Sequence, residues 1–316
     1  MKPIALLLTG GTIGSRVENG WAGVEVPAGT PAVLAHYRRT HPDTQAVFAV
    51  SAPLSVLSEN MTPADWSRLL DGLRGLDFAA YSGILITHGT DTLAYTAQLL
   101  AILLADAPVP VLLVSSHTPP ADENANGHRH FAAAVDWIER GGSPGVYAPL
   151  SDGGGEVRMI PADRLTQCAA LTDRFGVAPA RPARGGLSLL RRLPPLAGDV
   201  LLVQPYPGLD YRSVAFPPGV RAVLHGLYHS GTACAEGEHT GFQGFAARCA
   251  QAGIPLFVCP AREKDSAYRY LSAGALASAL PLYGIPPERA YALLTLGCAL
   301  YPDTDGLTAF MREMTA

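Results

Sequence analysis

Short apolar runs alternate along the chain with longer segments in which apolar residues recur every three or four positions. Runs rich in Val, Ile and Leu predict β-strands, and the longer periodic segments predict amphipathic helices. The predicted strands are residues 3–8, 46–50, 83–87, 109–115, 200–204, 221–226 and 254–258. The predicted helices are residues 30–39, 62–73, 93–104, 130–140, 241–252, 270–282 and 286–300.

Apolar strands separated by helices indicate parallel strands with helices on both faces of the sheet. One helix start is well marked, because Thr62 supplies a hydroxyl N-cap, Pro63 follows it, and Asp65 lies in the first turn. The sequence therefore predicts a doubly wound α/β fold.

Prolines and arginines gather between about residues 176 and 199, which is typical of an interdomain linker. We expect a larger N-terminal α/β domain at residues 1–180, a linker at 181–199 and a smaller α/β domain at 200–316.

The composition narrows the function classes. Of the 316 residues 48% are hydrophobic, so the chain can bury a full core, and a net charge of -4 provides no basic surface for nucleic acid or an anionic membrane. The most apolar stretch, residues 99–114, is interrupted by Asp106 and two prolines, which argues against a membrane-spanning helix. Charged residues make up only 16%, against ~25% in typical domains. We therefore expect part of the surface to be buried against another subunit.

The five cysteines are scattered and form no CxxC pair, which argues against a disulfide framework or a zinc knuckle. The apolar run at the start of the chain, residues 4–8, is shorter than a secretory signal requires. We expect a cytoplasmic protein.

Polar residues and glycines follow four of the predicted strands. In an open parallel sheet, ligands bind beyond the carboxyl ends of the strands. The segments at these ends are Thr-Gly-Gly-Thr-Ile-Gly at 9–14, Leu-Ser-Glu-Asn at 57–60, Thr-His-Gly-Thr-Asp-Thr at 87–92 and Ser-Ser-His at 115–117. Together they predict a site in which glycines admit a ligand to the backbone and hydroxyls supply a nucleophile.

Each segment also has a simpler interpretation. The glycines at 10–11 can serve only a tight turn, Asp91 can be an N-cap, and Ser58 with Glu59 can be a solvated loop. The first segment lacks the Walker and G-x-G-x-x-G spacings, which argues against a phosphate or dinucleotide site.

Two other constellations are weaker. The histidine pairs 225/229 and 128/130 lack an HExxH context or a carboxylate cluster, so structural roles are favoured over metal binding. A Ser116–His88–acid triad lacks the G-x-S-x-G turn that presents a nucleophilic serine.

The segments 9–14 and 87–92, in this order, resemble the bacterial-type L-asparaginase family, and most closely its cytoplasmic type I branch. Residues 58–63 are similar to the family's substrate loop, and residues 270–300 to its C-terminal helices. The resemblance implies a larger flavodoxin-like N-domain and a smaller C-domain, in homodimers or homotetramers whose active sites lie near the subunit interface. It implies hydrolysis of the asparagine side-chain amide to aspartate and ammonia, without metal or cofactor.

The resemblance also implies residue roles. Thr12 would be the nucleophile that forms the acyl-enzyme, and Thr90 the second catalytic threonine. Asp91 would bind the α-ammonium group and orient Thr90, and Ser58 would hold the α-carboxylate. The remaining substrate-binding positions are Glu59, which would face the ammonium group, Gly89, and Ser116, which would line the side-chain pocket.

The chain departs from the family pattern at several positions. Trp21 stands where the family has a tyrosine beside the nucleophile, and Thr232 stands where the neighbouring subunit contributes an asparagine. The stretch 156–160 lacks the family's catalytic lysine. Arg158 or Arg164 would supply positive charge but not a base.

Residues 124–127 read Asn-Ala-Asn-Gly in place of a Ser-Asp-Gly signature. The only lysines are Lys2 and Lys264, and Lys264 would have to come from a neighbouring subunit. Losing a general base costs ~10²–10⁴-fold in rate. The sequence therefore leaves three functions open: an asparaginase, an amidase for another substrate, and a noncatalytic amino-acid-binding relative.

Overall fold

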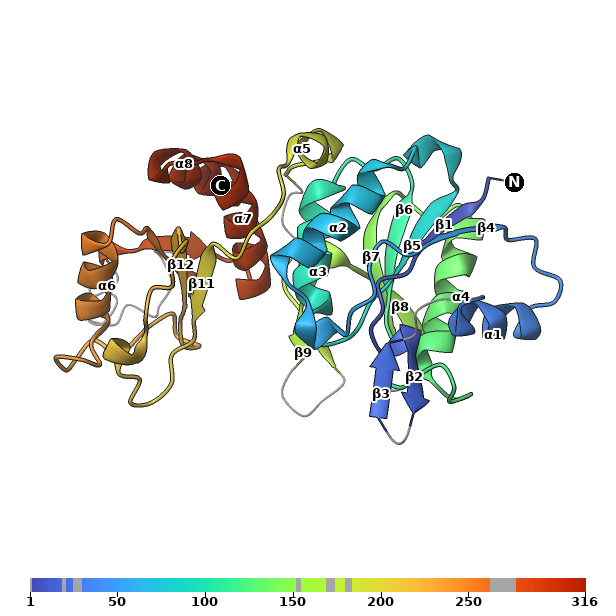
Figure 1. The fold of residues 1–316 in the computed structure, drawn as a ribbon, viewed down its shortest axis with the longest axis horizontal. Coiled ribbons are helices and arrows are strands. Elements are labelled where there is room, and N and C mark those ends of the chain that lie inside the picture. Colours follow the sequence, from blue (N-terminus) through green and yellow to red (C-terminus); the bar gives the residue numbers. More distant parts are fainter. Residues whose placement is uncertain are drawn as a thin grey trace. The chain divides into compact units, whose positions relative to one another are not determined.

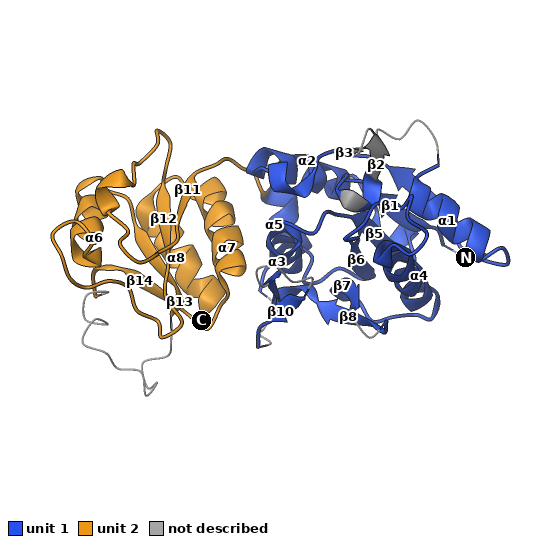
Figure 2. Ribbon diagram, turned by 90° about the horizontal axis from the view of Figure 1, so that it is seen from below, with its two compact units in different colours: residues 1–192 blue, residues 193–316 orange. Residues whose placement is uncertain are grey.

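The computed structural model describes residues 2–18, 21–24, 30–151, 155–168, 174–179, 184–261 and 277–316. The chain divides into two compact units, residues 1–192 and residues 193–316 (Figure 2). The first unit ends with helix α5 (Leu187–Arg192), which lies inside the segment expected to be a linker. In the described part of the chain, no helix has both the length and the apolar composition needed to cross a bilayer.

A six-stranded sheet forms the centre of the first unit (Figure 1). Its order is β4-β1-β5-β6-β7-β8, and all neighbouring pairs are parallel except β7 and β8. The strands are β1 (Ile4–Leu7), β4 (Phe48–Ser51), β5 (Gly83–Thr87), β6 (Pro110–Val114), β7 (Gly145–Ser151) and β8 (Val157–Pro161). The sequence predicted the first four, and missed β7 and the antiparallel β8.

Helices cover both faces of this sheet, which confirms the doubly wound prediction (Figure 1). On one face, α1 (Ala32–Thr40) and α4 (Asn126–Glu139) pack on the apolar side chains of β1, β5 and β6, with Tyr37 and Phe131 at the centre of the cluster. On the other face lie α2 (Pro63–Arg74) and α3 (Leu93–Leu103).

The strand order reverses direction between β1 and β5. From β1 the chain first crosses to β4 on one side of β1, and then to β5 on the other side. In parallel sheets such a reversal leaves a crevice at the carboxyl ends of the two strands. The turns that follow β1 and β5 are the two glycine-containing segments at 9–14 and 87–92, so the topology brings both segments to one place.

Two hairpins complete the first unit. Strands β2 (Ser15–Glu18) and β3 (Trp21–Val24) follow the short 3₁₀ helix η1 (Thr12–Gly14), and they pair antiparallel. Strands β9 (Leu165–Cys168) and β10 (Phe175–Val177) pair antiparallel after the 3₁₀ helix η4 (Ala162–Arg164). The sequence analysis predicted neither hairpin.

The second unit is a parallel four-stranded sheet in the order β11 (Val200–Val203), β12 (Ala222–Gly226), β13 (Leu256–Ala261) and β14 (Leu280–Tyr283). Helix α6 (Phe242–Gln251) places Phe242 and Phe245 in the core of this unit. Helix α7 (Pro287–Leu300) contacts β11, β12 and β13, and α8 (Thr304–Thr315) packs on α7.

The predicted helix at residues 270–282 is wrong in the part that the structure describes. Residues 270–282 were expected to be helical, but Leu280 begins β14, which pairs in parallel with Phe257 and Val258 of β13. Pairing along the free edge of β13 outweighs the helical pattern there, because a strand added to a buried sheet satisfies its backbone groups. Residues 270–276 lie outside the described residues. Helix α8 was not predicted.

The start of α2 tests the predicted cap. The Thr62 hydroxyl accepts a hydrogen bond from the Asp65 backbone N–H, and the Asp65 carboxylate accepts one from the Thr62 backbone N–H at 2.8 Å. We expect Thr62→Ala to lower the free energy of unfolding of the first unit by about 1 kcal/mol, because the hydroxyl that accepts the Asp65 N–H is lost. Urea denaturation followed by circular dichroism would measure the loss.

Thr304→Ala is the matched control, because Thr304 is exposed at the start of α8 and the cap there is Asp303. That substitution should change the stability by less than ~0.5 kcal/mol. Equal effects of the two substitutions would contradict a specific role of the Thr62 cap.

Candidate functional site

The turn after β1 is held on both sides by its neighbours. Thr9 exchanges hydrogen bonds with Thr87 of β5, its backbone N–H donating to Thr87 Oγ1 at 3.0 Å and its hydroxyl donating to the Thr87 carbonyl. On the other side, the Gly11 N–H donates to the Val56 carbonyl at 2.9 Å. The backbone of Thr12 therefore starts η1 from a fixed position, while its side chain lies outside the described part of the structure.

Glycines are required where this turn meets the turn after β5. Gly11 has φ +73°, and a Cβ atom there would lie 2.3 Å from the Gly89 backbone nitrogen. A Cβ atom on Gly89 would lie 2.3 Å from Ser58 Oγ. The segments around residues 11, 58 and 89 are thus in direct contact, as the sequence predicted from strand ends alone.

Ser58 and Asp91 form the polar centre of this contact. Ser58, in the 3₁₀ helix η2 (Ser58–Asn60), is only 2% exposed, and its hydroxyl donates to Asp91 Oδ2 at 3.2 Å. The Asp91 N–H donates back to Ser58 Oγ at 3.2 Å, and the Thr92 hydroxyl donates to the Ser58 carbonyl at 2.9 Å. Two of the predicted substrate-binding residues are therefore brought together from segments 33 residues apart.

The site carries negative charge that faces solvent. Asp91 and Glu59 are exposed, and within the described residues no lysine or arginine forms a salt bridge with either. Thr90 is half-buried, and Thr92 is the N-cap of α3. The positive end of the helix dipole lies beside the two carboxylates, so the site offers binding groups for both signs of charge.

A glutamine that the sequence analysis missed supports Asp91 from behind. Gln167 of β9 donates its side-chain amide to the Asp91 backbone carbonyl. The strand that carries Gln167 is in turn fixed by buried Gln98 of α3, whose amide donates to the Asp163 and Leu165 carbonyls at 3.0 and 2.8 Å. No sequence motif marks Gln167, because its partner is reached only through the hairpin.

Ser116 is held by the start of α4. It is 1% exposed, its hydroxyl donates to the Thr118 carbonyl at 2.6 Å, and it accepts the Gly127 N–H at 3.1 Å. Asn126 Oδ1 accepts the His117 N–H at 2.9 Å. The hydroxyl expected to line a substrate pocket is thus occupied within the protein, by Thr118 and by Asn126 and Gly127 of the altered segment 124–127.

Two buried histidines at this edge of the sheet are held neutral. His88 Nδ1 donates to the Gly89 carbonyl at 2.7 Å, and burial lowers its pKa to about 4. His130 Nδ1 donates to the Ser115 carbonyl at 2.9 Å, its Nε2 accepts the Ser151 N–H at 3.2 Å, and burial lowers its pKa to about 4. Both therefore act as neutral supports for the backbone near physiological pH.

The other histidines set aside by the sequence analysis have local partners. His128 Nε2 lies 3.1 Å from the Pro120 and Asp122 carbonyls, and His225 Nε2 lies 2.8 Å from the Tyr211 hydroxyl. Burial lowers the pKa of His225 to about 4. In the described ranges, no three His, Cys, Asp or Glu residues are grouped as metal ligands would be.

The basic residues considered as substitutes for the family's lysine have partners of their own. Arg164 Nε donates to the Ala178 carbonyl at 2.9 Å, and Arg158 lies on the edge strand β8 with its guanidinium 4.0 Å from Glu156. Lys2 donates to the Ala79 carbonyl at 2.6 Å, at the end of the sheet opposite to the turns. Lys264 and the side chain of Trp21 lie outside the described residues.

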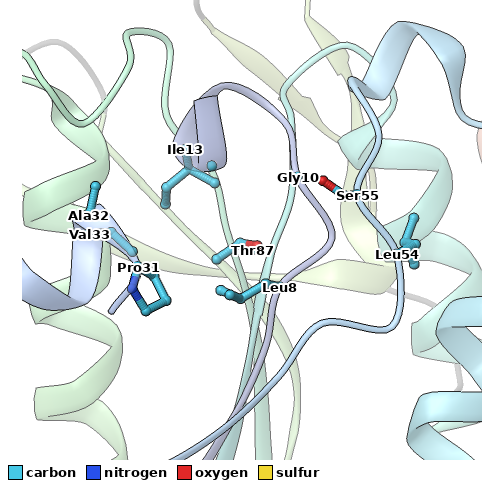
Figure 3. A pocket seen from close by; sticks show the side chains of 10 residues that line it. Leu8, Gly10, Ile13, Pro31, Ala32, Val33, Leu54, Ser55 and Thr87 are labelled. Carbon is cyan, nitrogen blue, oxygen red and sulfur yellow. The ribbon is translucent and has the colours of Figure 1, made fainter. Parts of the chain in front are cut away.

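An apolar hollow lies beneath η1 (Figure 3). Ile13 points into it from above and Thr87 from below, and Val33 closes it from the side of α1. Leu8 and Leu54 add further apolar surface. The η1 turn therefore rests on an apolar support, while Gly11 just before it meets Gly89.

A family model described as "Asparaginase, N-terminal" matches residues 3–165, just over half of the 316-residue chain. A glutamyl-tRNA(Gln) amidotransferase subunit from Thermoplasma volcanium is 37% identical over 139 residues, which cover 42% of this chain and 33% of that protein. An L-asparaginase from Thermococcus kodakarensis is 34% identical over 150 residues, which cover 47% of this chain and 44% of that protein. The chain thus spans less than two thirds of the length of these curated relatives.

Two solved structures share the fold over nearly the whole chain. The thermostable L-asparaginase from Thermococcus kodakarensis has a TM-score of 0.72 and 22% identity, covering 98% of this chain and 96% of that one. L-asparaginase I from Vibrio cholerae has a TM-score of 0.73 and 21% identity, covering 99% and 97%. At such identities the likeness concerns the fold.

The contact of Gly11 with Gly89 predicts a position-specific cost. We expect Gly11→Ala to lower the free energy of unfolding by ~3 kcal/mol or more, because a positive φ is combined with a clash against backbone that cannot move aside. Gly14→Ala is the control in the same η1 turn, since a Cβ there meets nothing within 4 Å. It should change the stability by less than ~1 kcal/mol. Thermal melting of both variants would measure the difference, and similar losses would argue against a tight contact.

Proposed function

The chain belongs to the asparaginase family, and from this membership we propose that it hydrolyses the side-chain amide of L-asparagine to L-aspartate and ammonia. The observation that carries the proposal is the hydrogen-bonded Ser58–Asp91 pair at the crevice between β1 and β5. A ligand there meets an exposed carboxylate, a hydroxyl and two glycine turns within one contact. These groups suit an α-amino acid.

Asp91 binds the α-ammonium group of the substrate in this proposal. Its carboxylate is exposed and forms no salt bridge with a described residue, so a ligand cation would be its partner. Glu59, one residue after Ser58, adds a second negative charge to the same side. Ser58 and the N–H groups that begin α3 hold the α-carboxylate, because helix N-termini bind anions.

Thr12 is the proposed nucleophile. Its oxygen would bond to the amide carbon, ammonia would leave, and water would then hydrolyse the resulting ester to aspartate. The fixed η1 turn and the close approach of Gly11 to Gly89 support this role, since a nucleophile must be held in position against its substrate. Thr90, half-buried beside Asp91, is the proposed second catalytic threonine.

We propose that the protein works without metal or cofactor, in the cytoplasm, as a homodimer or homotetramer. Low charge, 16% of residues, supports burial of surface between subunits. Thr232 would then contribute to a neighbour's site; its carbonyl accepts the Tyr228 N–H at 2.9 Å and its hydroxyl lies 3.0 Å from that of Ser230, so its loop has a defined shape.

A second candidate function comes from the amidotransferase subunits among the relatives. A chain of this kind would release ammonia for a partner protein. The third candidate is an amino-acid-binding protein that retains Ser58 and Asp91 without turnover. Supplying asparagine, glutamine and other amides to the isolated protein separates these hypotheses, because only the first gives full turnover of asparagine without a partner.

Our central prediction concerns Thr12. Purified protein should release ammonia from L-asparagine, Thr12→Ala should reduce the rate to background, and Thr12→Ser should retain part of it because a hydroxyl remains. Ligand-induced shifts in melting temperature should persist in Thr12→Ala, since binding does not need the nucleophile. A wild-type protein that is stabilised by asparagine yet releases no ammonia would favour the binding hypothesis.

A further prediction separates head-group binding from chemistry. Asp91→Asn should raise KM for asparagine by ~10–100-fold, because a charge-assisted bond to the ammonium group is worth about 1.5–3 kcal/mol. Asp71→Asn is the control, since Asp71 is an exposed helix carboxylate that pairs with Arg74 on α2. Steady-state kinetics would measure both. An unchanged KM in Asp91→Asn would place the ammonium group elsewhere.

A further inference from the structure

Three histidines lie at the carboxyl edge of the first sheet, and only one of them is accessible to solvent. His88 is fully buried and His130 is 1% exposed, whereas His117 is half-exposed just beyond β6. Resting on the function proposed above, we infer that His117 is the proton-transfer residue of this site. It would carry out the proton transfer for which the family uses a lysine.

The register of the sheet brings His117 to the level of Thr90. Thr87 of β5 pairs in parallel with Val114 of β6, and the ladder continues one step, since the His88 N–H donates to the Val114 carbonyl at 2.9 Å. His117 follows Val114 by three residues, as Thr90 follows Thr87.

A second contact links the loop after β6, which carries His117, to the η1 turn, which carries Thr12. A Cβ atom on Gly127 would lie 2.5 Å from the Ser116 Cβ and 3.5 Å from the Ile13 Cδ1. The neighbour of His117 and the neighbour of Thr12 therefore pack on the same glycine of α4. Gly127 thus lies between the loop that carries His117 and the η1 turn.

The backbone of His117 is fixed by the first turn of α4. Asn126 Oδ1 accepts its N–H at 2.9 Å, and Ser116 is bound to both Thr118 and Gly127. Helix α4 is 14 residues long and its inner face lies in the apolar core, so the anchor is rigid. The backbone of His117 therefore has a fixed position at the carboxyl end of β6.

The other two imidazoles do not suit proton transfer. His88 and His130 are enclosed, and each donates its Nδ1–H to a backbone carbonyl, while burial lowers the pKa of both to about 4. A proton-transfer group must reach the substrate, and neither of these two enclosed rings can do so.

Several charged or titratable groups lie on the described elements next to His117. They are His130 and Arg129 on α4, Asp122 and Glu123 before α4, and His88 and Asp91 after β5.

His117 would carry one proton in each half of the reaction. Neutral His117 takes the Thr12 hydroxyl proton, directly or through one water, as the threonine oxygen bonds to the amide carbon. The imidazolium gives this proton to the amide nitrogen as the carbon–nitrogen bond breaks and ammonia leaves. In the second half, His117 takes a proton from water as water attacks the ester, and returns it to the Thr12 oxygen as the ester bond breaks.

The test is the pH profile of kcat/KM for ammonia release from L-asparagine. Protonated His117 accepts no proton, so wild-type activity should fall towards acid pH and give the profile an acid limb. His117→Gln should lower kcat by ~10²–10⁴-fold, remove this acid limb and leave KM within about 3-fold. His41→Gln is the control, since His41 is an exposed histidine at the C-terminal end of α1. It should change neither the rate nor the limb.

Two further variants separate proton transfer from a structural role. In Asn126→Asp the His117 N–H keeps its acceptor while a nearby negative charge stabilises the imidazolium, so the acid limb should move to higher pH. Added imidazole should raise the rate of His117→Ala. A His117→Gln enzyme with normal kcat and an unchanged acid limb would overturn the assignment. If the wild type releases ammonia from neither asparagine nor glutamine, the proposed function fails, and this inference fails with it.

Discussion

The close approach of the backbones at Gly11 and Gly89 is the constraint on which the site depends. A side-chain carbon on either residue would meet a neighbouring atom at 2.3 Å, so the two turns touch only because both residues lack one. The reversal of strand order between β1 and β5 brings these turns to the same crevice. Topology supplies the crevice, and the glycines allow the turn that carries Thr12 and the turn that carries Asp91 to approach each other, as the proposed function requires.

Each polar group at the crevice is held from behind by the body of the unit. Ser58 fixes the Asp91 carboxylate, Gln167 fixes the Asp91 carbonyl, and Asn126 fixes the His117 backbone. The supporting groups come from a 3₁₀ helix, a hairpin and a helix N-terminus, so no single element could shift without breaking a contact. Catalytic sites gain rate from such preorganisation, because the donors and acceptors are in place before the substrate arrives.

The sequence predicts those parts of the molecule that have local causes. Strands β1 and β5 and the glycine turns that follow them can be predicted directly, and the rule that parallel strand ends converge brings Ser58 to Asp91. The supports could not be predicted, since Gln167 reaches Asp91 only through a hairpin, and Ser116 is occupied by a helix start 11 residues later. Strand β14 was missed because pairing with β13 overrides its local pattern.

The scarcity of lysine changes the electrostatics of the site as well as its proton chemistry. Lys2 is bound at the opposite end of the sheet, so in the described residues the crevice holds Asp91 and Glu59 without a permanent ammonium charge beside them. A neutral His117 imidazole, in the role inferred for it above, would leave that balance unchanged between turnovers and add positive charge only while it carries a proton. In the proposed function the substrate's ammonium group would therefore meet an uncompensated acidic surface. Its carboxylate would depend on neutral donors, namely Ser58 and the N-terminus of α3, and this division would favour a zwitterionic amino acid over a simple amide or a dianion.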